Sequence, residues 1–137
     1  MSEKIPAEYL DLLEKPIVVT FATINPDGTP QITPVWCSYD GTHILINSAL
    51  GRRKDKNIHA NPNVAVLAVD PANPYRYLEI RGRVVEITQE GAVEHIHQLT
   101  RKYTEFDRYY GGFAPLEREQ QETRVMYKIA PVRVLAH

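Results

Sequence analysis

The chain has 137 residues, of which 43% are hydrophobic and 24% are charged, and this composition is typical of a folded globular protein. Its net charge is -1, from 16 Lys and Arg against 17 Asp and Glu, so no overall basic field draws it to nucleic acid or to an anionic membrane. The single cysteine, Cys37, excludes an internal disulfide and a cysteine-based zinc site.

The N-terminus and the apolar runs indicate no targeting or membrane segment. The first residues lack the apolar region of a signal peptide, and no run reaches the roughly 18 apolar residues of a membrane span. A lone cysteine fits a reducing compartment. We therefore expect a single domain over residues 1–137, located in the cytoplasm, with neither a membrane nor a nucleic-acid partner.

The N-terminal third predicts an antiparallel meander of strands. After a short helix over residues 9–13, residues 17–24 are β-branched and aromatic, which is typical of a strand. A second strand over residues 31–39 leads through a tight turn into a third over residues 43–47. Because Pro34 has no N–H to donate, we expect the second strand to lie at a sheet edge or to carry a bulge.

The rest of the chain predicts further strands and one long helix. Residues 64–69 are typical of a buried strand, and the longest strand pattern follows over residues 75–88, with Gly82 marking a bend or bulge. Apolar residues spaced three and four apart predict a helix over residues 89–106, and a last strand covers residues 123–135. Together these patterns favour a mainly β fold of about six antiparallel strands, with one long helix packed on a barrel.

A cluster of small, polar and basic residues follows the third strand. A phosphate site needs this combination, because small residues let the backbone approach an anion, a helix N-terminus offers unpaired N–H groups, and cations donate charge-assisted hydrogen bonds. On spacing alone, a short basic helix is more often a solvated surface. The cluster consists of Asn47, Ser48, Ala49, Gly51, Arg52, Arg53, Lys54 and Lys56.

The order of these elements resembles the pyridoxamine 5'-phosphate oxidase-like split-barrel superfamily, and within it the small proteins that depend on the deazaflavin coenzyme F420. The most specific motifs are Gly28-x-Pro30-x-x-Thr33-Pro34-Val35-Trp36 and Ser48-x-x-Gly51-Arg52-x-Lys54-x-x-Asn57. The resemblance implies a split β-barrel of the FMN- or F420-binding type. It also implies a homodimer with cofactor sites at the subunit interface. A short C-terminal end sets the chain apart from true pyridoxamine phosphate oxidases and argues against vitamin B6 oxidation.

The resemblance assigns roles to residues of both motifs. Arg52 and Lys54 match the positions that bind the cofactor phosphate, the segment around Trp36 lies along the tricyclic ring, and Tyr77 matches an aromatic position near the ring. The expected cofactor-binding residues are Thr33, Pro34, Val35, Trp36, Asn47, Ser48, Ala49, Arg52, Arg53, Lys54, Asn57 and Tyr77.

The implied activity is that of an F420-dependent reductase, which transfers hydride between reduced deazaflavin and a small unsaturated or conjugated substrate. Because the cofactor carries this chemistry, we expect no dedicated catalytic dyad. F420 ends in an anionic tail, which would bind to cations beyond the phosphate site. The presence of such cations therefore favours F420 over FMN. The candidates are Arg53, Lys56, Arg81 and Arg83. The alternatives are an FMN-binding oxidase or reductase of the same family and a non-catalytic cofactor carrier.

The remaining candidate site residues are histidines of the predicted long helix and aromatic residues within it and just after it. His95 and His97 lie two residues apart on the predicted helix and face different directions, so we expect no metal site. The aromatic cluster of Tyr103, Phe106, Tyr109 and Tyr110 is more often helix packing, with the lip of a pocket as the alternative.

Overall fold

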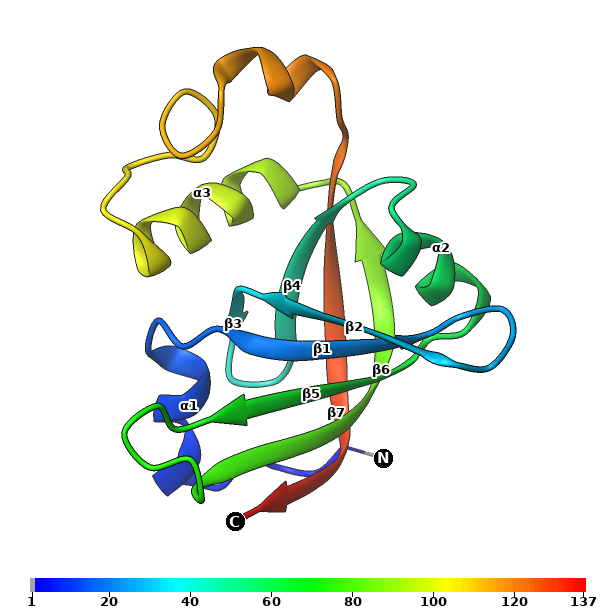
Figure 1. Ribbon diagram of the computed structural model, residues 1–137, viewed down its shortest axis with the longest axis vertical. Coiled ribbons are helices and arrows are strands. Elements are labelled where there is room, and N and C mark those ends of the chain that lie inside the picture. The colour runs from blue at the N-terminus through cyan, green and yellow to red at the C-terminus, as the bar shows by residue number, and fades with distance from the viewer. Residues whose placement is uncertain (1) are drawn as a thin grey trace.

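The computed structural model describes residues 2–137 and contains one antiparallel sheet of seven strands, in the order β2-β1-β5-β6-β7-β4-β3. The sheet curls strongly, so that its strands surround a common interior (Figure 1). The expected mainly β, split-barrel fold is confirmed. The strands are β1 (Val19–Ile24), β2 (Pro30–Val35), β3 (Cys37–Tyr39), β4 (Ile44–Ala49), β5 (Asn63–Val69), β6 (Tyr77–Thr88) and β7 (Arg124–Ala136).

The helices lie around the ends of the curled sheet. The long helix α3 and the segment after it stand beside β4 and β7 at one end, and α1 contacts β3 and β5 at the other (Figure 1). Among the described residues, no helix is long and apolar enough to cross a membrane. The helical elements are η1 (Ala7–Tyr9), α1 (Asp11–Glu14), α2 (Arg53–Ala60), α3 (Ala92–Tyr103) and η2 (Leu116–Gln120).

Trp36 divides the second expected strand in two. Before it, β2 pairs with β1, and after it, β3 pairs with β4. Pro34 lies in β2, which is an edge strand, as its missing N–H requires. Because β2 and β3 are the two edges of the sheet and are separated by one residue, the edges must approach each other, since consecutive Cα atoms are only about 3.8 Å apart. This connection closes the barrel at Trp36.

The barrel interior is filled by alternate residues of the strands. Phe21, Ile46, Ile80 and Tyr127 are fully buried members of this core. Gly82 lies beside a register shift between β6 and β7, which confirms the expected irregularity at that position. A Cβ atom at Gly82 would lie 2.6 Å from Ile129 Cγ2, so close packing requires glycine there.

A second, smaller apolar cluster holds α3 in place. Ile96 and Leu99 on the inner face of α3 pack with Tyr109 and Tyr110 from the segment that follows. The half-buried Trp36 packs against this cluster. The junction of the two sheet edges therefore faces α3, and the space between them is the candidate site.

Candidate anion-binding pocket

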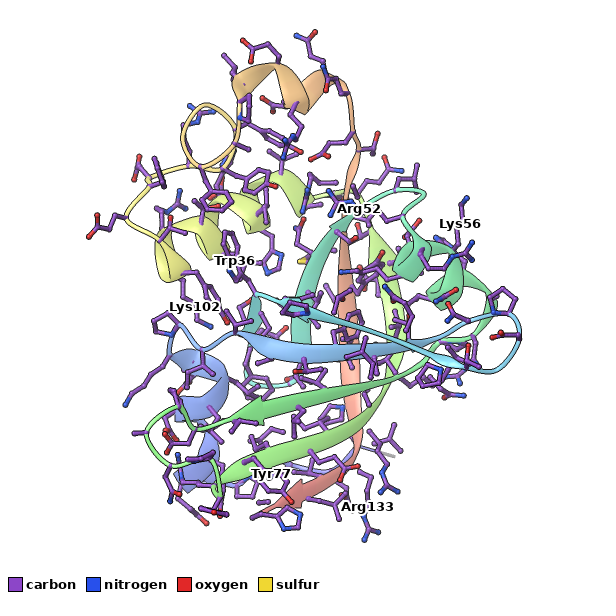
Figure 2. The ribbon with its side chains drawn as sticks, viewed as in Figure 1. Trp36, Arg52, Lys56, Tyr77, Lys102 and Arg133 are labelled. Carbon is purple, nitrogen blue, oxygen red and sulfur yellow. The ribbon has the colours of Figure 1, made fainter. Side chains whose placement is uncertain are left out.

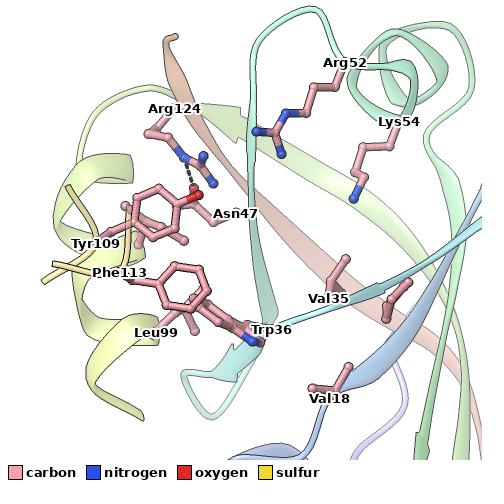
Figure 3. A pocket seen from close by; sticks show the side chains of 12 residues that line it. Val18, Val35, Trp36, Asn47, Arg52, Lys54, Leu99, Tyr109, Phe113 and Arg124 are labelled. Carbon is pink, nitrogen blue, oxygen red and sulfur yellow. Dashed lines mark hydrogen bonds between the residues drawn. The ribbon is translucent and has the colours of Figure 1, made fainter. Parts of the chain in front are cut away.

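A cavity of about 410 Å³ lies between the junction of the sheet edges, the start of α2 and the inner face of α3 (Figure 3). Its volume falls within the usual range for a small-molecule site. One end is cationic and the other is apolar and aromatic. The lining residues are Val18, Pro34, Val35, Trp36, Asn47, Arg52, Lys54, Ile96, Leu99, Tyr109, Phe113 and Arg124.

Three cations gather at one end of the cavity. Arg52 is the N-terminal cap of α2, Lys54 lies in its first turn, and Arg124 begins β7. Burial lowers the pKa of Lys54, and the charges of Arg52 and Arg124 lower it further. The three side chains therefore repel one another across the pocket, and an anion placed between them would relieve that repulsion.

The loop that carries Arg52 is fixed from behind by a buried carboxylate. Asp55 accepts a hydrogen bond from the Gly51 N–H at 3.0 Å and another from the Tyr127 hydroxyl at 2.7 Å. Gly51 adopts a positive φ of 87°, which only glycine takes without strain. These contacts set the direction in which α2 starts and so aim Arg52 and Lys54 at the cavity.

Arg124 is almost fully buried and is held on three sides. Its Nε–H donates to Asn47 Oδ1 at 2.8 Å, and its Nη1 donates to Glu122 Oε2 at 3.0 Å. Its guanidinium also lies over the Tyr109 ring, 5.1 Å from the ring centre. Figure 3 shows the guanidinium pointing into the cavity. A buried arginine with N–H groups to spare is a strong anion ligand.

Asn47 connects this arginine to a buried histidine. The Asn47 amide donates to Ala92 O at 2.8 Å and faces His95 Nδ1 at 3.1 Å, while His95 Nε2 lies 3.0 Å from Ser38 Oγ. Burial lowers the pKa of His95 to about 4, and the charges of Arg124 and Lys102 act in the same direction. His95 is thus neutral at pH 7. Because Nδ1 faces an amide donor, it accepts, and the ring proton lies on Nε2 and is donated to Ser38.

Aromatic side chains form the other end of the cavity. Trp36 stacks on Tyr103 with ring centres 5.4 Å apart, and Phe113 packs edge-on against Trp36 at 5.2 Å. The Tyr103 hydroxyl donates to Ile17 O at 2.7 Å, which fixes its ring behind Trp36. The wall is therefore aromatic and largely apolar, and it suits a flat organic ring.

Six of the twelve residues expected from the sequence line this cavity. Thr33 is half-buried on β2, and its Oγ1 has no hydrogen-bond partner among residues 2–137. Arg53 is exposed on α2, and Tyr77 stacks on His137 near the end of the sheet opposite Arg52 (Figure 2). The six lining residues are Pro34, Val35, Trp36, Asn47, Arg52 and Lys54.

The three other expected residues are buried and support the fold. Ser48 and Ala49 lie in β4, where they pair with Val125 and Arg124 of β7. The Asn57 amide donates to Thr23 Oγ1 and Asn25 Oδ1, both at 3.0 Å. Asn57 therefore holds α2 against the C-terminal end of β1 and does not line the cavity.

Five lining residues are not among the candidates that the sequence indicates. Tyr109, which the sequence allows as the lip of a pocket, lines the cavity, whereas Phe113 lies in a segment with no periodic pattern. Arg124 is a charged residue at the start of a strand that is otherwise largely buried. A charge in such a position indicates a functional role, and this is the signal that could have identified Arg124. The five residues are Val18, Ile96, Leu99, Phe113 and Arg124.

The remaining histidine of α3 has a structural contact. His97 Nδ1 accepts a hydrogen bond from the Tyr109 N–H at 2.9 Å, which holds the segment after α3 in place. Within residues 2–137, no group of three or more His, Cys, Asp or Glu side chains is arranged to hold a metal ion.

Comparison with known proteins finds a matching family and similar solved structures. A family model described as pyridoxamine 5'-phosphate oxidase matches residues 5–137. A solved structure of an F420 reductase superposes with a TM-score of 0.81 and 34% identity, covering 96% of this chain and 98% of that one. A conserved hypothetical protein of Mycobacterium tuberculosis superposes with a TM-score of 0.70 and 26% identity, over 98% of this chain and 85% of that one.

One curated relative is longer than this chain. It is a pyridoxine/pyridoxamine 5'-phosphate oxidase of Rhodopseudomonas palustris (strain BisB5), 26% identical over 125 residues. The match covers 90% of this chain but spans only about half, 56%, of the relative.

Proposed function

The chain belongs to the pyridoxamine 5'-phosphate oxidase family, and we propose that it is an oxidoreductase that uses coenzyme F420 to reduce a small unsaturated or conjugated substrate. The similarity to an F420 reductase extends over nearly the full length of both chains, at 34% identity. The similarity to the curated oxidase is lower and leaves much of that protein unmatched. The comparison therefore favours F420 over vitamin B6 chemistry.

The pocket has the donor set that a phosphorylated, tricyclic cofactor requires. The observation that carries the proposal is the pairing of three cations at one end, Arg52, Lys54 and Arg124, with the aromatic wall around Trp36 at the other. Cations and a helix start suit a phosphate, whereas the wall suits a flat ring. A cavity with the cationic end alone would suit an inorganic anion, and a cavity with the aromatic end alone would suit an uncharged ring.

Different residues of the chain bind the phosphate and the ring of the cofactor. Arg52 and Lys54 bind the phosphate, while Pro34, Val35 and Trp36 lie along the ring and exclude water from it. The bound cofactor supplies hydride transfer, and the protein supplies orientation and electrostatics.

The cations proposed for the anionic tail fall into two groups. Arg53 and Lys56 are exposed on α2, the helix that also carries Lys54. They are the candidates for the tail carboxylates. Arg81 and Arg83 are exposed on β6 and do not line the pocket, so we assign them no role in the site of their own chain.

A second copy of the chain is the proposed partner. A second hollow, of about 340 Å³, is formed by residues of β1, β5, β6 and β7 and is lined mainly by apolar residues, among them Ala22, Ile24 and Val132. Val132 is 44% exposed. A homodimer would cover this hollow, and sedimentation would then give twice the mass of one chain. A monomer at all concentrations would contradict it.

FMN is the second candidate cofactor, because the curated relative is a pyridoxine/pyridoxamine phosphate oxidase and the same pocket suits a phosphomonoester. Titrating the cofactor-free protein with F420 and FMN in parallel separates the two. We expect tighter binding of F420, followed by hydride transfer from its reduced form to a conjugated acceptor. Binding without transfer to a broad panel of acceptors indicates a carrier, and binding of neither cofactor contradicts the proposal.

Two charge reversals on one helix test the assignment of the phosphate site. Lys54→Glu puts a negative charge among Arg52 and Arg124 and should abolish cofactor binding. Lys56→Glu makes the same change at an exposed position of α2 and should weaken binding only modestly. Equal effects of the two substitutions would contradict the assignment.

A further inference from the structure

Glu122 lies in the short segment between η2 and β7 and joins three parts of the pocket rim. Its Oε2 accepts a hydrogen bond from the Tyr110 hydroxyl at 2.6 Å and another from Arg124 Nη1 at 3.0 Å. Its Oε1 accepts from Arg52 Nη2 at 3.4 Å. Glu122 does not line the cavity, yet it contacts two of the three cations that do.

Glu122 is an internal counter-ion of the anion site. Its side chain is only 15% exposed. Although burial acts to raise its pKa, the hydrogen bonds from Tyr110 and Arg124 bring it below its ordinary value, so the carboxylate is ionised at pH 7. Its negative charge opposes the field of Arg52, Lys54 and Arg124 at the place where a ligand anion binds.

The placement of Arg124 does not depend on this negative charge. Asn47 holds Nε, and Tyr109 supports the face of the guanidinium. A glutamine at position 122 keeps an amide oxygen that accepts from Arg124 and from Tyr110. In Glu122→Gln the amide nitrogen replaces Oε1 and cannot accept from Arg52 Nη2, so the substitution removes the negative charge together with the long 3.4 Å contact to Arg52 and keeps the contacts that place Arg124.

A fixed negative charge acts on ligands in proportion to their own charge. At the phosphate itself, the phosphodiester of F420 carries one negative charge, whereas the phosphomonoester of FMN carries nearly two at pH 7. The tail carboxylates of F420 are assigned to Arg53 and Lys56, which are exposed and do not line the pocket, so solvent screens their interaction with Glu122. Repulsion from the same carboxylate is therefore about twice as large for the monoester. A ring without phosphate feels almost none.

We propose that Glu122 is a selectivity residue of the pocket, which disfavours phosphomonoesters relative to phosphodiesters and so favours F420 over FMN. The inference rests on the proposed function, because it assumes that a phosphorylated ring compound occupies the pocket. The apolar wall binds the ring of either cofactor, and the charge beside the cations distinguishes their phosphates.

The test is a titration of the wild type and of Glu122→Gln with riboflavin, F420 and FMN at low salt. We expect Glu122→Gln to leave riboflavin affinity unchanged and to tighten F420 binding on the order of tenfold, with a further tenfold for FMN. The preference for F420 over FMN then falls about tenfold. This gain should shrink in 0.5 M salt, because screening weakens an electrostatic effect and not a packing effect.

Glu117→Gln is the matched control, because Glu117 is exposed on η2 and loses the same charge. Its F420-to-FMN ratio should equal that of the wild type. An unchanged ratio in Glu122→Gln, or an equal gain for riboflavin, overturns the inference even if F420 binds well. If neither protein binds F420, the proposed function fails, and the comparison of FMN with riboflavin still decides the role of Glu122.

Discussion

Replacing Asn47 by leucine removes the residue that connects Arg124, α3 and His95. The side chain makes hydrogen bonds to Arg124 Nε, to Ala92 O and to His95 Nδ1. Each such bond contributes about 1 kcal/mol net, and a buried partner left unpaired adds to the loss. We therefore expect Asn47→Leu to lower the free energy of unfolding by about 2 to 4 kcal/mol, measured by urea denaturation.

Gln98→Leu provides the comparison for this substitution. Gln98 is exposed on α3, so the same replacement of a side-chain amide by leucine should alter the free energy of unfolding by less than about 0.5 kcal/mol. A loss below about 1 kcal/mol in Asn47→Leu would show that these bonds do not hold α3 and Arg124 in place. The description of the pocket wall would then be wrong.

Two further predictions concern packing and pH. Gly82→Ala places a Cβ 2.6 Å from Ile129 Cγ2 and should destabilise the protein by about 1 to 3 kcal/mol in thermal or urea unfolding; a neutral effect would contradict the packing of β6 on β7. The pKa of His95 is lowered from 6.5 to about 4, so the unfolded chain binds the proton more readily. Stability from this group is complete above pH 6.5 and is lost, by up to roughly 3 kcal/mol, as the pH falls to about 4. His95→Gln should flatten that part of the curve of stability against pH, and an unaltered curve would refute the assignment.

The strands could be predicted because their residues carry a local pattern. Runs such as residues 17–24 are β-branched and apolar, and the turns between them contain glycine and proline. The division at Trp36 could not be predicted in the same way. Each side of Trp36 pairs with a different strand, and pairing between distant segments leaves no trace in a local pattern.

The site could be predicted in part for the same reason. Arg52 and Lys54 lie in a continuous basic segment that a sequence motif identifies. Arg124 reaches the pocket only because β7 pairs with β4, which places it opposite Ala49. Tyr77 has the residue type expected near a ring, but the length of β6 carries it to the other end of the sheet (Figure 2).

The central claim is that this pocket holds the cofactor, and a crystal structure of the protein with F420 tests it most directly. We expect the phosphate to accept hydrogen bonds from Arg52 and Lys54, and the deazaflavin ring to lie along Pro34, Val35 and Trp36. A cofactor bound elsewhere, or a phosphate that contacts neither cation, would contradict the account.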